Sequence, residues 1–146
     1  MSGRTVKVYF RLAQDESEYP PTDSEFLWCA PTERGTYVVD NIPFFVRDIG
    51  LGDEISVEAI GKVLHFSSVI KQSRNSTIRV LFKKPGVAER IQQKLTSMGC
   101  SAELMDKLSL LAMNMPQDAP TKAVLAFLDK EAEQGNIGIE ESAVRY

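Results

Sequence analysis

Histidine and cysteine are scarce in this sequence of 146 residues, which has one histidine, His65, and two cysteines, Cys29 and Cys100. Catalysis by a Ser-His-Asp or Cys-His arrangement would have to use His65. A zinc site would have to combine His65 with scattered cysteines and carboxylates, and their spacing matches no zinc motif. Two cysteines are also too few for a disulfide-built secreted domain. We therefore expect no catalytic residues, no metal, no cofactor and two buried free thiols.

Long apolar runs are absent as well. No stretch approaches the roughly 18 consecutive apolar residues that a membrane-spanning helix needs. The N-terminal residues 1–7 carry charges, but no apolar segment of a signal peptide follows them. The sequence thus predicts a cytoplasmic protein that does not use a membrane as a partner.

Nucleotide and acid–base motifs are equally weak. Gly50-Leu51-Gly52 is a GxG, but no helix is expected after it to bind a phosphate at its N-terminus. The adjacent acids of Asp53-Glu54 and Glu140-Glu141 each fall on an expected strand, where neighbouring side chains point to opposite faces. We expect Asp53 to bond the backbone of a turn, and we expect a protein that is not an enzyme.

The first half, residues 1–74, alternates between apolar and polar residues over short stretches. This period of two predicts strands at about 5–12, 54–60 and 62–72, and we expect two more strands at about 25–30, which is apolar on both faces, and at about 36–40. So many short strands suggest a small, strongly bent sheet or a partly open barrel. Most aromatics of this half lie in apolar runs, so we expect them in the core; on an exposed sheet face they would instead stack nucleic-acid bases. These aromatics are Tyr19, Trp28, Phe44, Phe45 and Phe66.

The second half, residues 75–146, has a different pattern. Apolar residues spaced as on one helix face predict helices at about 87–98 and from about 121 to 134, the second with Asp118 or Thr121 as its N-cap. Strands are expected on either side of each helix, so the order is strand, helix, strand, strand, helix, strand. That is the ferredoxin-like order. The fold class is therefore α+β, with two subdomains that we expect to pack together.

Charge is unevenly distributed in a chain whose formal net charge is -3. One acidic cluster lies in an expected loop and another near the C-terminus. As candidate partner-binding residues we select Asp15, Glu16, Glu18, Tyr19, Asp23, Glu140 and Glu141. Basic residues gather where the two halves meet. The alternative polar site consists of Lys71, Arg74, Asn75, Arg79 and Lys83.

One set of residues carries a family resemblance. Trp28 is followed by Gly35-Thr36-Tyr37-Val38-Val39-Asp40-Asn41-Ile42-Pro43-Phe44-Phe45, then by Gly52-Asp53 and by Ser73-Arg74-Asn75-Ser76-Thr77-Ile78-Arg79. Between about Glu25 and Met115 this pattern resembles an uncharacterised family of small bacterial proteins, a domain of unknown function. The family implies no activity. Small acidic bacterial proteins of this kind are similar in character to immunity proteins, which neutralise a toxin delivered by a neighbouring cell.

Two functional hypotheses follow. The first is a non-enzymatic bacterial immunity protein that occludes a cognate protein toxin. Because the chain is acidic, a basic, nuclease-like toxin would suit it. The second hypothesis is an RNA- or nucleotide-binding regulator that uses the basic segment Lys71–Lys84. The negative net charge disfavours nucleic acid as the main partner, since phosphate binding needs clustered Lys and Arg.

Overall fold

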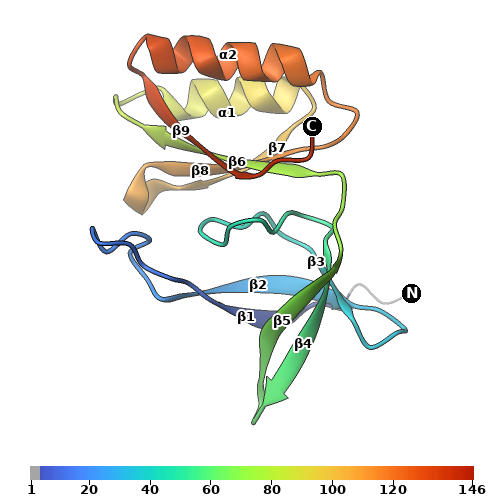
Figure 1. The fold of residues 1–146 in the computed structure, drawn as a ribbon. Helices are drawn as coiled ribbons and strands as arrows, with labels where there is room; N and C mark the ends of the chain where they lie inside the picture. The colour runs from blue at the N-terminus through green and yellow to red at the C-terminus, as the bar shows by residue number, and fades with distance from the viewer. Residues whose placement is uncertain (1–3) are drawn as a thin grey trace. The chain divides into compact units, whose positions relative to one another are not determined.

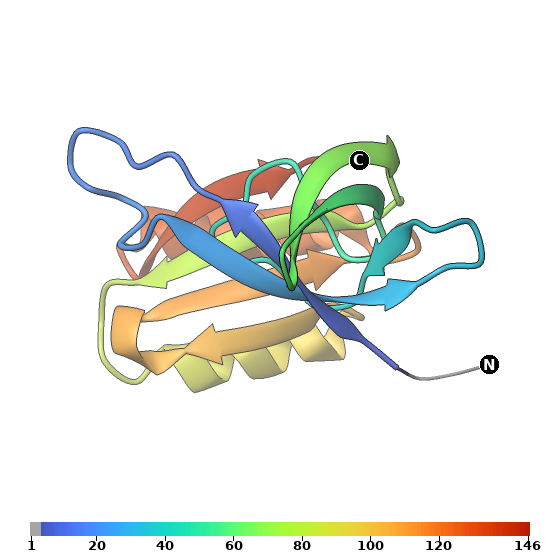
Figure 2. The ribbon, with the colours of Figure 1, turned by 90° about the horizontal axis from the view of Figure 1, so that it is seen from below.

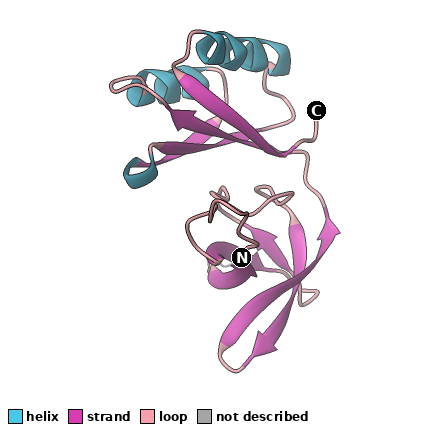
Figure 3. Cartoon of the chain, turned by 60° about the vertical axis from the view of Figure 1, so that its left-hand side comes forward, coloured by secondary structure: helices cyan, strands magenta, loops and turns pink. Residues whose placement is uncertain are grey.

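The computed structural model describes residues 4–146 and shows a mixed α+β chain (Figure 1). The chain divides into two compact units, Met1–Ser73 and Arg74–Tyr146. Within residues 4–73 the first unit consists of strands and loops, and every helix of the described residues belongs to the second unit (Figure 3). Each unit is described by itself below.

The first unit is a closed five-stranded barrel. Its strands are β1 (Val6–Arg11), β2 (Ser24–Pro31), β3 (Tyr37–Val39), β4 (Glu54–Ile60) and β5 (Val63–Lys71). Each strand runs antiparallel to the next, so the first and fifth run in the same direction. Closure therefore uses a parallel pairing, in which Tyr9 of β1 lies opposite His65 of β5. The sequence predicted a strongly bent sheet or a partly open barrel; the structure shows a barrel that is fully closed, because β5 returns to bond β1.

The barrel interior is filled by alternate residues of the strands together with residues of the loop after β3. Phe10 of β1 stacks on Phe66 of β5 with ring centroids 4.8 Å apart. The buried core also includes Val8, Leu27, Cys29, Val39, Val46, Ile49 and Ile55. The sequence predicted that Phe44 and Phe45 lie in the core. Both rings are only half-buried, and Val46 and Ile49 of the same loop enter the core instead.

The second unit is a four-stranded antiparallel sheet with two helices. Its elements are β6 (Ser76–Phe82), α1 (Ala88–Ser97), β7 (Ser101–Met105), the short 3-10 helix η1 (Asp106–Leu108), β8 (Leu110–Met115), α2 (Thr121–Glu133) and β9 (Ile137–Ala143). The strand order is β7-β8-β6-β9, so β6 and β8 are central. Figure 1 shows both helices on the same side of this sheet.

Both helices bury one stripe of apolar residues. Ile91 and Leu95 of α1, and Val124 and Leu128 of α2, are each one turn apart and fully or almost fully buried. They pack with Ile78, Val80, Leu111, Met113 and Ile137 of the sheet. The predicted N-cap of α2 is wrong: Pro120 occupies that position, and no side chain bonds the cap. Among the described residues no helix is long and apolar enough to cross a membrane.

Candidate functional site: a hollow at the barrel mouth

A hollow of about 460 Å³ opens at one end of the barrel. Phe10 and Phe66, which face the barrel interior, reach this hollow, so it continues from the core. Most of its other walls are apolar, and they come from the loop after β1, the loop after β3 and the second half of β5. These wall residues are Leu12, Ala13, Pro20, Phe45, Val46, Ile49 and Val69. Barrel mouths of this size and character are common ligand or anchor sites.

Four polar side chains complete the lining. Arg11, Arg47, Asp48 and Gln72 are all exposed residues that border the hollow. An apolar pocket with a few polar groups at its edge can hold the apolar side chain of a partner while the polar groups fix its orientation.

The loop after β3, which forms part of the wall of the hollow, is held in place by the carboxylate of Glu25. Glu25 on β2 accepts hydrogen bonds from three successive backbone N–H groups, those of Phe44 at 2.8 Å, Phe45 at 2.9 Å and Val46 at 3.0 Å. A carboxylate that binds several backbone donors orders the segment that carries them. Glu25 thereby sets the position of Phe45 and Val46, two of the wall residues.

The acidic loop, residues 12–23, borders the same hollow through Leu12, Ala13 and Pro20. Asp15 holds the loop in shape, because its Oδ1 accepts bonds from Ser17 N at 2.8 Å, Ser17 Oγ at 2.6 Å and Tyr19 N at 3.0 Å. The side-chain bond from Ser17 is the main reason that the pKa of Asp15 lies below its usual value. Asp15 is thus ionised and structurally engaged at neutral pH.

The remaining acids of this loop face solvent. Glu16, Glu18 and Asp23 are exposed, and so is Tyr19, whose ring lies 6.2 Å from that of Phe45 in an edge-on arrangement. The loop that carries five of the predicted partner-binding residues therefore borders the hollow, although none of the five is among the lining residues. The hollow itself had no signal in the sequence, because its walls come from segments far apart in the chain.

The other two predicted partner-binding residues lie on β9 in the second unit. Glu140 Oε1 accepts a bond from Arg79 Nε at 2.9 Å, and Glu141 Oε2 accepts one from Tyr146 Oη at 2.9 Å. Burial, followed by this bond to Glu141, raises the pKa of Tyr146 to about 12. Glu140 is half-buried and already paired, so Glu141 is the more accessible of the two carboxylates.

The alternative polar site does not form one exposed surface. Arg79 has a relative exposure of only 1%, and its Nη2 also donates to Ser142 Oγ at 2.7 Å. Lys71, Arg74 and Lys83 are exposed, but Lys71 belongs to the first unit. Asn75 is half-buried and its carbonyl accepts a bond from Arg145 Nη1 at 3.2 Å. Arg79 is therefore engaged in internal bonding.

The histidine and the cysteines lie in different environments. His65 is half-buried on the outward side of β5, with its ring 4.9 Å from that of Tyr9. Cys29 points into the barrel core, where burial is the main cause that raises its pKa to about 12. Burial also raises the pKa of Cys100. Both sulfurs are therefore thiols rather than thiolate nucleophiles at neutral pH.

Trp28 and Asp53 were expected in the core and in a turn, respectively. Trp28 is 46% exposed, so its predicted place in the core is wrong: it lies on the outward side of β2. Asp53 is buried and bonds turn backbone as expected, since its Oδ2 accepts from Gly50 N at 2.9 Å. No group of three or more His, Cys, Asp or Glu residues within 4–146 is arranged to hold a metal ion.

Comparison with known proteins identifies the family and the fold. No curated protein matches the chain. A solved structure described as "Novel crystal structure of a hypothetical protein from Neisseria gonorrhoeae" is similar, with a TM-score of 0.81 and 18% sequence identity over 100% of this chain and 99% of that chain. At this identity the likeness concerns the fold alone. The family described as "Domain of unknown function (DUF4265)" matches residues 25–139, most of the sequence, and the chain therefore belongs to this family.

Proposed function

We propose that this chain is a non-enzymatic binding protein that holds a basic protein partner at the barrel mouth. The carrying observation is that a largely apolar hollow of about 460 Å³ lies beside a loop with exposed Glu16, Glu18 and Asp23. An apolar side chain of the partner enters the hollow. Lys or Arg residues of the partner, next to that side chain, face the carboxylates of Glu16, Glu18 and Asp23. Such an anchor with a charged rim is the usual layout of a protein interface.

The biological role that we propose is that of a bacterial immunity protein, which occludes a cognate toxin. The toxin is basic and nuclease-like, since a basic surface complements the acidic loop and association is then accelerated by charge. Tyr19 serves as an aromatic anchor, because its ring is 38% exposed and is backed by Phe45. Neutralisation requires no reaction by the immunity protein.

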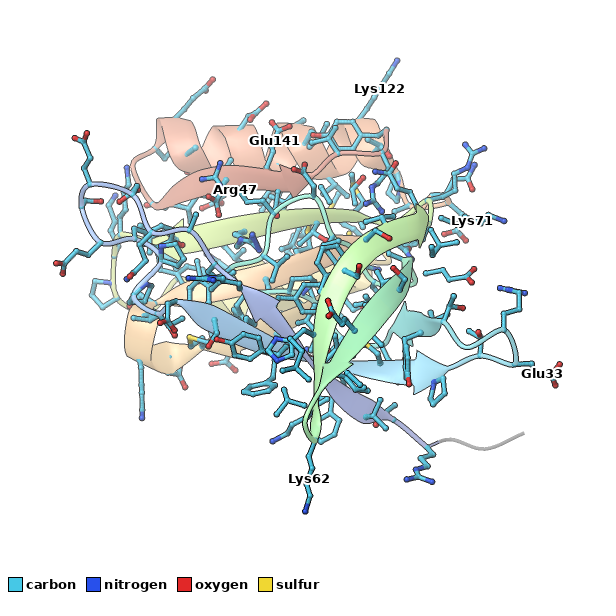
Figure 4. The ribbon with its side chains drawn as sticks, turned by 60° about the horizontal axis from the view of Figure 1, so that its bottom comes forward. Glu33, Arg47, Lys62, Lys71, Lys122 and Glu141 are labelled. Atoms are coloured by element: carbon cyan, nitrogen blue, oxygen red, sulfur yellow. The ribbon has the colours of Figure 1, made fainter. Side chains whose placement is uncertain are left out.

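The test is co-expression with the protein encoded by the neighbouring toxin reading frame. The wild-type chain should protect the cells and co-purify with the toxin, whereas a Glu16→Lys, Glu18→Lys double variant should bind at least about tenfold more weakly because two carboxylates become cations. Glu33→Lys is the matched control, since Glu33 is an exposed acid on the turn between β2 and β3 (Figure 4). Absence of protection and of a complex with the wild-type chain would refute the proposal.

The nucleic-acid alternative at Lys71, Arg74, Asn75, Arg79 and Lys83 is weaker. Arg79 is buried and bonded to Glu140 and Ser142. It is therefore not accessible to a phosphate group, and the set has one fewer cation to bind nucleic acid. A gel shift at low salt that disappears in the Arg74→Ala, Lys83→Ala double variant would restore this alternative.

For the second unit we propose the ferredoxin-like arrangement. The strand order β7-β8-β6-β9 supports it, because numbering β6, β7, β8 and β9 as 1 to 4 gives the order 2-3-1-4. The connections also support it, since α1 lies between β6 and β7, and α2 lies between β8 and β9. An experimental structure with another strand order would refute this assignment.

A further inference from the structure

The outward side of the barrel carries aromatic rings on three adjacent strands. We name this surface the outer wall and define it by Lys7 and Tyr9 on β1, Phe26 and Trp28 on β2, and His65 on β5. Phe26 is 50% and Trp28 46% exposed. Large aromatics on a strand are usually buried, so two exposed rings side by side indicate a contact surface.

The strand pairings place these rings next to one another. Tyr9 lies opposite Phe26, and Lys7 lies opposite Trp28, in the antiparallel pair of β1 and β2. On the other side Tyr9 lies opposite His65. The ring of Tyr9 is 5.3 Å from that of Phe26 and 4.9 Å from that of His65, both edge-on. The result is a continuous row of rings across β5, β1 and β2, the three strands seen from below in Figure 2.

Basic side chains alternate with these rings. Along β1 the outward residues are Lys7, Tyr9 and Arg11, and both Lys7 and Arg11 are exposed. The ammonium of Lys7 lies 5.6 Å from the ring centroid of Phe26 and 5.3 Å from that of Trp28. Lys62 extends from the tip of the hairpin of β4 and β5 (Figure 4). Two acids border the outer wall: Glu58 lies opposite His65, and the exposed Asp40 donates its backbone N–H to the carbonyl of Trp28 at 2.8 Å.

The position of Lys7 distinguishes between the two kinds of macromolecule that bind aromatic surfaces. The centre of a protein interface is depleted of lysine, because the ammonium loses its water there. Here the ammonium of a lysine lies over both exposed rings of the outer wall, Phe26 and Trp28. Single-stranded nucleic acid has the matching pattern, since its bases stack on aromatic rings while its phosphates face cations.

We propose that the outer wall binds single-stranded nucleic acid. Bases stack on Phe26 and Trp28, with Tyr9 and His65 extending the platform, and the phosphates are bound by Lys7 and Arg11. Lys7 moves from the ring faces to a phosphate as the bases arrive. This exchange is favourable, because an exposed cation–π contact is weaker than the stacking of a base on an aromatic ring. The aromatic platform is separate from the hollow at the barrel mouth, although Arg11 also borders that hollow.

Trp28 is the only tryptophan of the chain, so its fluorescence reports directly on this surface. We would titrate the protein at low salt with an oligothymidylate of about ten nucleotides, a length within the range that small barrels bind. Quenching of Trp28 that saturates is the expected result. Inorganic polyphosphate, which has the charges but no bases, should quench much less, and so should duplex DNA, whose bases are already stacked.

The salt dependence gives a second readout. Two phosphate contacts, by Lys7 and Arg11, predict a slope of about -1.4 for the logarithm of the binding constant against that of salt concentration. Lys7→Gln removes one contact, so its slope should be smaller in magnitude by about 0.7. Lys122→Gln, which removes an exposed cation of the second unit, should leave the slope unchanged.

Two variants of Phe26 separate stacking from charge. Phe26→Ala should weaken binding by at least about fivefold, the lower end of the effect of losing one stacked base. Phe26→Leu keeps an apolar side chain without a ring face and should weaken binding similarly. Tyr146→Ala, an exposed aromatic of the second unit, is the control that should bind as the wild type does. Circular dichroism checks that each variant is folded.

Three results would overturn the proposal. They are an unchanged Trp28 signal with the oligothymidylate at low salt, equal quenching by polyphosphate, and Phe26→Leu binding as tightly as the wild type. The first would leave the outer wall as a surface for a protein, and the second would make it a site for anions in general.

Discussion

Glu25 and Phe45 are joined across the barrel mouth by a hydrogen bond from the Phe45 backbone N–H to Glu25 Oε1, with a length of 2.9 Å. The same carboxylate also accepts from Phe44 and Val46. One side chain of β2 thus orders the loop that forms a wall of the hollow. The hollow therefore depends on a residue that is not part of its lining.

Replacing Glu25 by glutamine should loosen this loop. The amide has a single oxygen, and its NH₂ group faces donors, so at least one backbone N–H loses its partner. We expect a loss of stability on the order of 1 to 3 kcal/mol. Hydrogen exchange should accelerate at the amides of Phe44, Phe45 and Val46. Glu33→Gln on an exposed turn is the control, and unchanged protection of the three amides would contradict the prediction.

Acid should destabilise the second unit through Glu131. Its carboxylate forms a bidentate ion pair with Arg90, in which Nη1 donates to Oε2 and Nη2 donates to Oε1, each at 2.7 Å. Arg90 is the main cause that lowers the pKa of Glu131 from 4.5 to about 2, and a bond from Asn136 adds to it. Because the pKa is lower in the folded state, this stabilisation is complete above about pH 4.5 and is lost as the pH falls towards 2.

The measurement is the thermal midpoint of the helical circular-dichroism signal, since α1 and α2 both belong to the second unit. Glu131→Gln should lower this midpoint at neutral pH, and its difference from the wild type should shrink between about pH 4.5 and 2. Glu133→Gln removes an exposed acid of the same helix and is the control. A difference that is independent of pH would contradict this assignment.

The two thiols should be inert in the folded protein. Cys29 has no exposed surface, Cys100 has a relative exposure of 4%, and burial raises the pKa of both. Alkylating reagents attack the thiolate, so modification at mildly alkaline pH should be slow without denaturant and complete with it. Mass spectrometry of the intact chain measures the added groups. Rapid double modification of the native protein would be the contrary result.

Asp53 should tolerate asparagine poorly. It is fully buried, and its two oxygens accept bonds from Gly50 N and Ser73 N, both at 2.9 Å. Asparagine offers one acceptor oxygen and points an NH₂ group at the other donor. The loss should be on the order of 1 to 3 kcal/mol. Trp28 fluorescence during urea unfolding measures it, and Asp40→Asn at an exposed position is the control.

Local patterns in the sequence were enough to predict most strands and both helices. Alternation identified β1, and the spacing of Ile91 and Leu95 identified α1, because these signals depend only on neighbours in the chain. The same dependence on neighbours explains why Trp28 was wrongly predicted to lie in the core. β2 is apolar on both faces, so its sequence does not indicate which face the rest of the protein covers. The outer wall became visible only when the pairing placed Phe26 beside Tyr9.

The barrel mouth could be predicted only in part. The acidic loop was chosen from its charges, and Asp15, Glu16, Glu18, Tyr19 and Asp23 do lie together. The hollow beside it needs Phe45, Val46 and Val69 from later segments, and no local pattern links these to the loop. Arg79 was selected because it belongs to a basic stretch of the sequence, but its position on the strand places it beside Glu140 and Ser142.

The order of the strands along the chain determines when each unit can fold during translation. All strands of the barrel precede β6, so the barrel can close as soon as β5 has emerged from the ribosome. β6 pairs with β8 and β9, and both of these strands follow it in the chain. The first unit can therefore fold while the second is still being synthesised, as domains generally do. During that interval β6 lacks both of its strand neighbours.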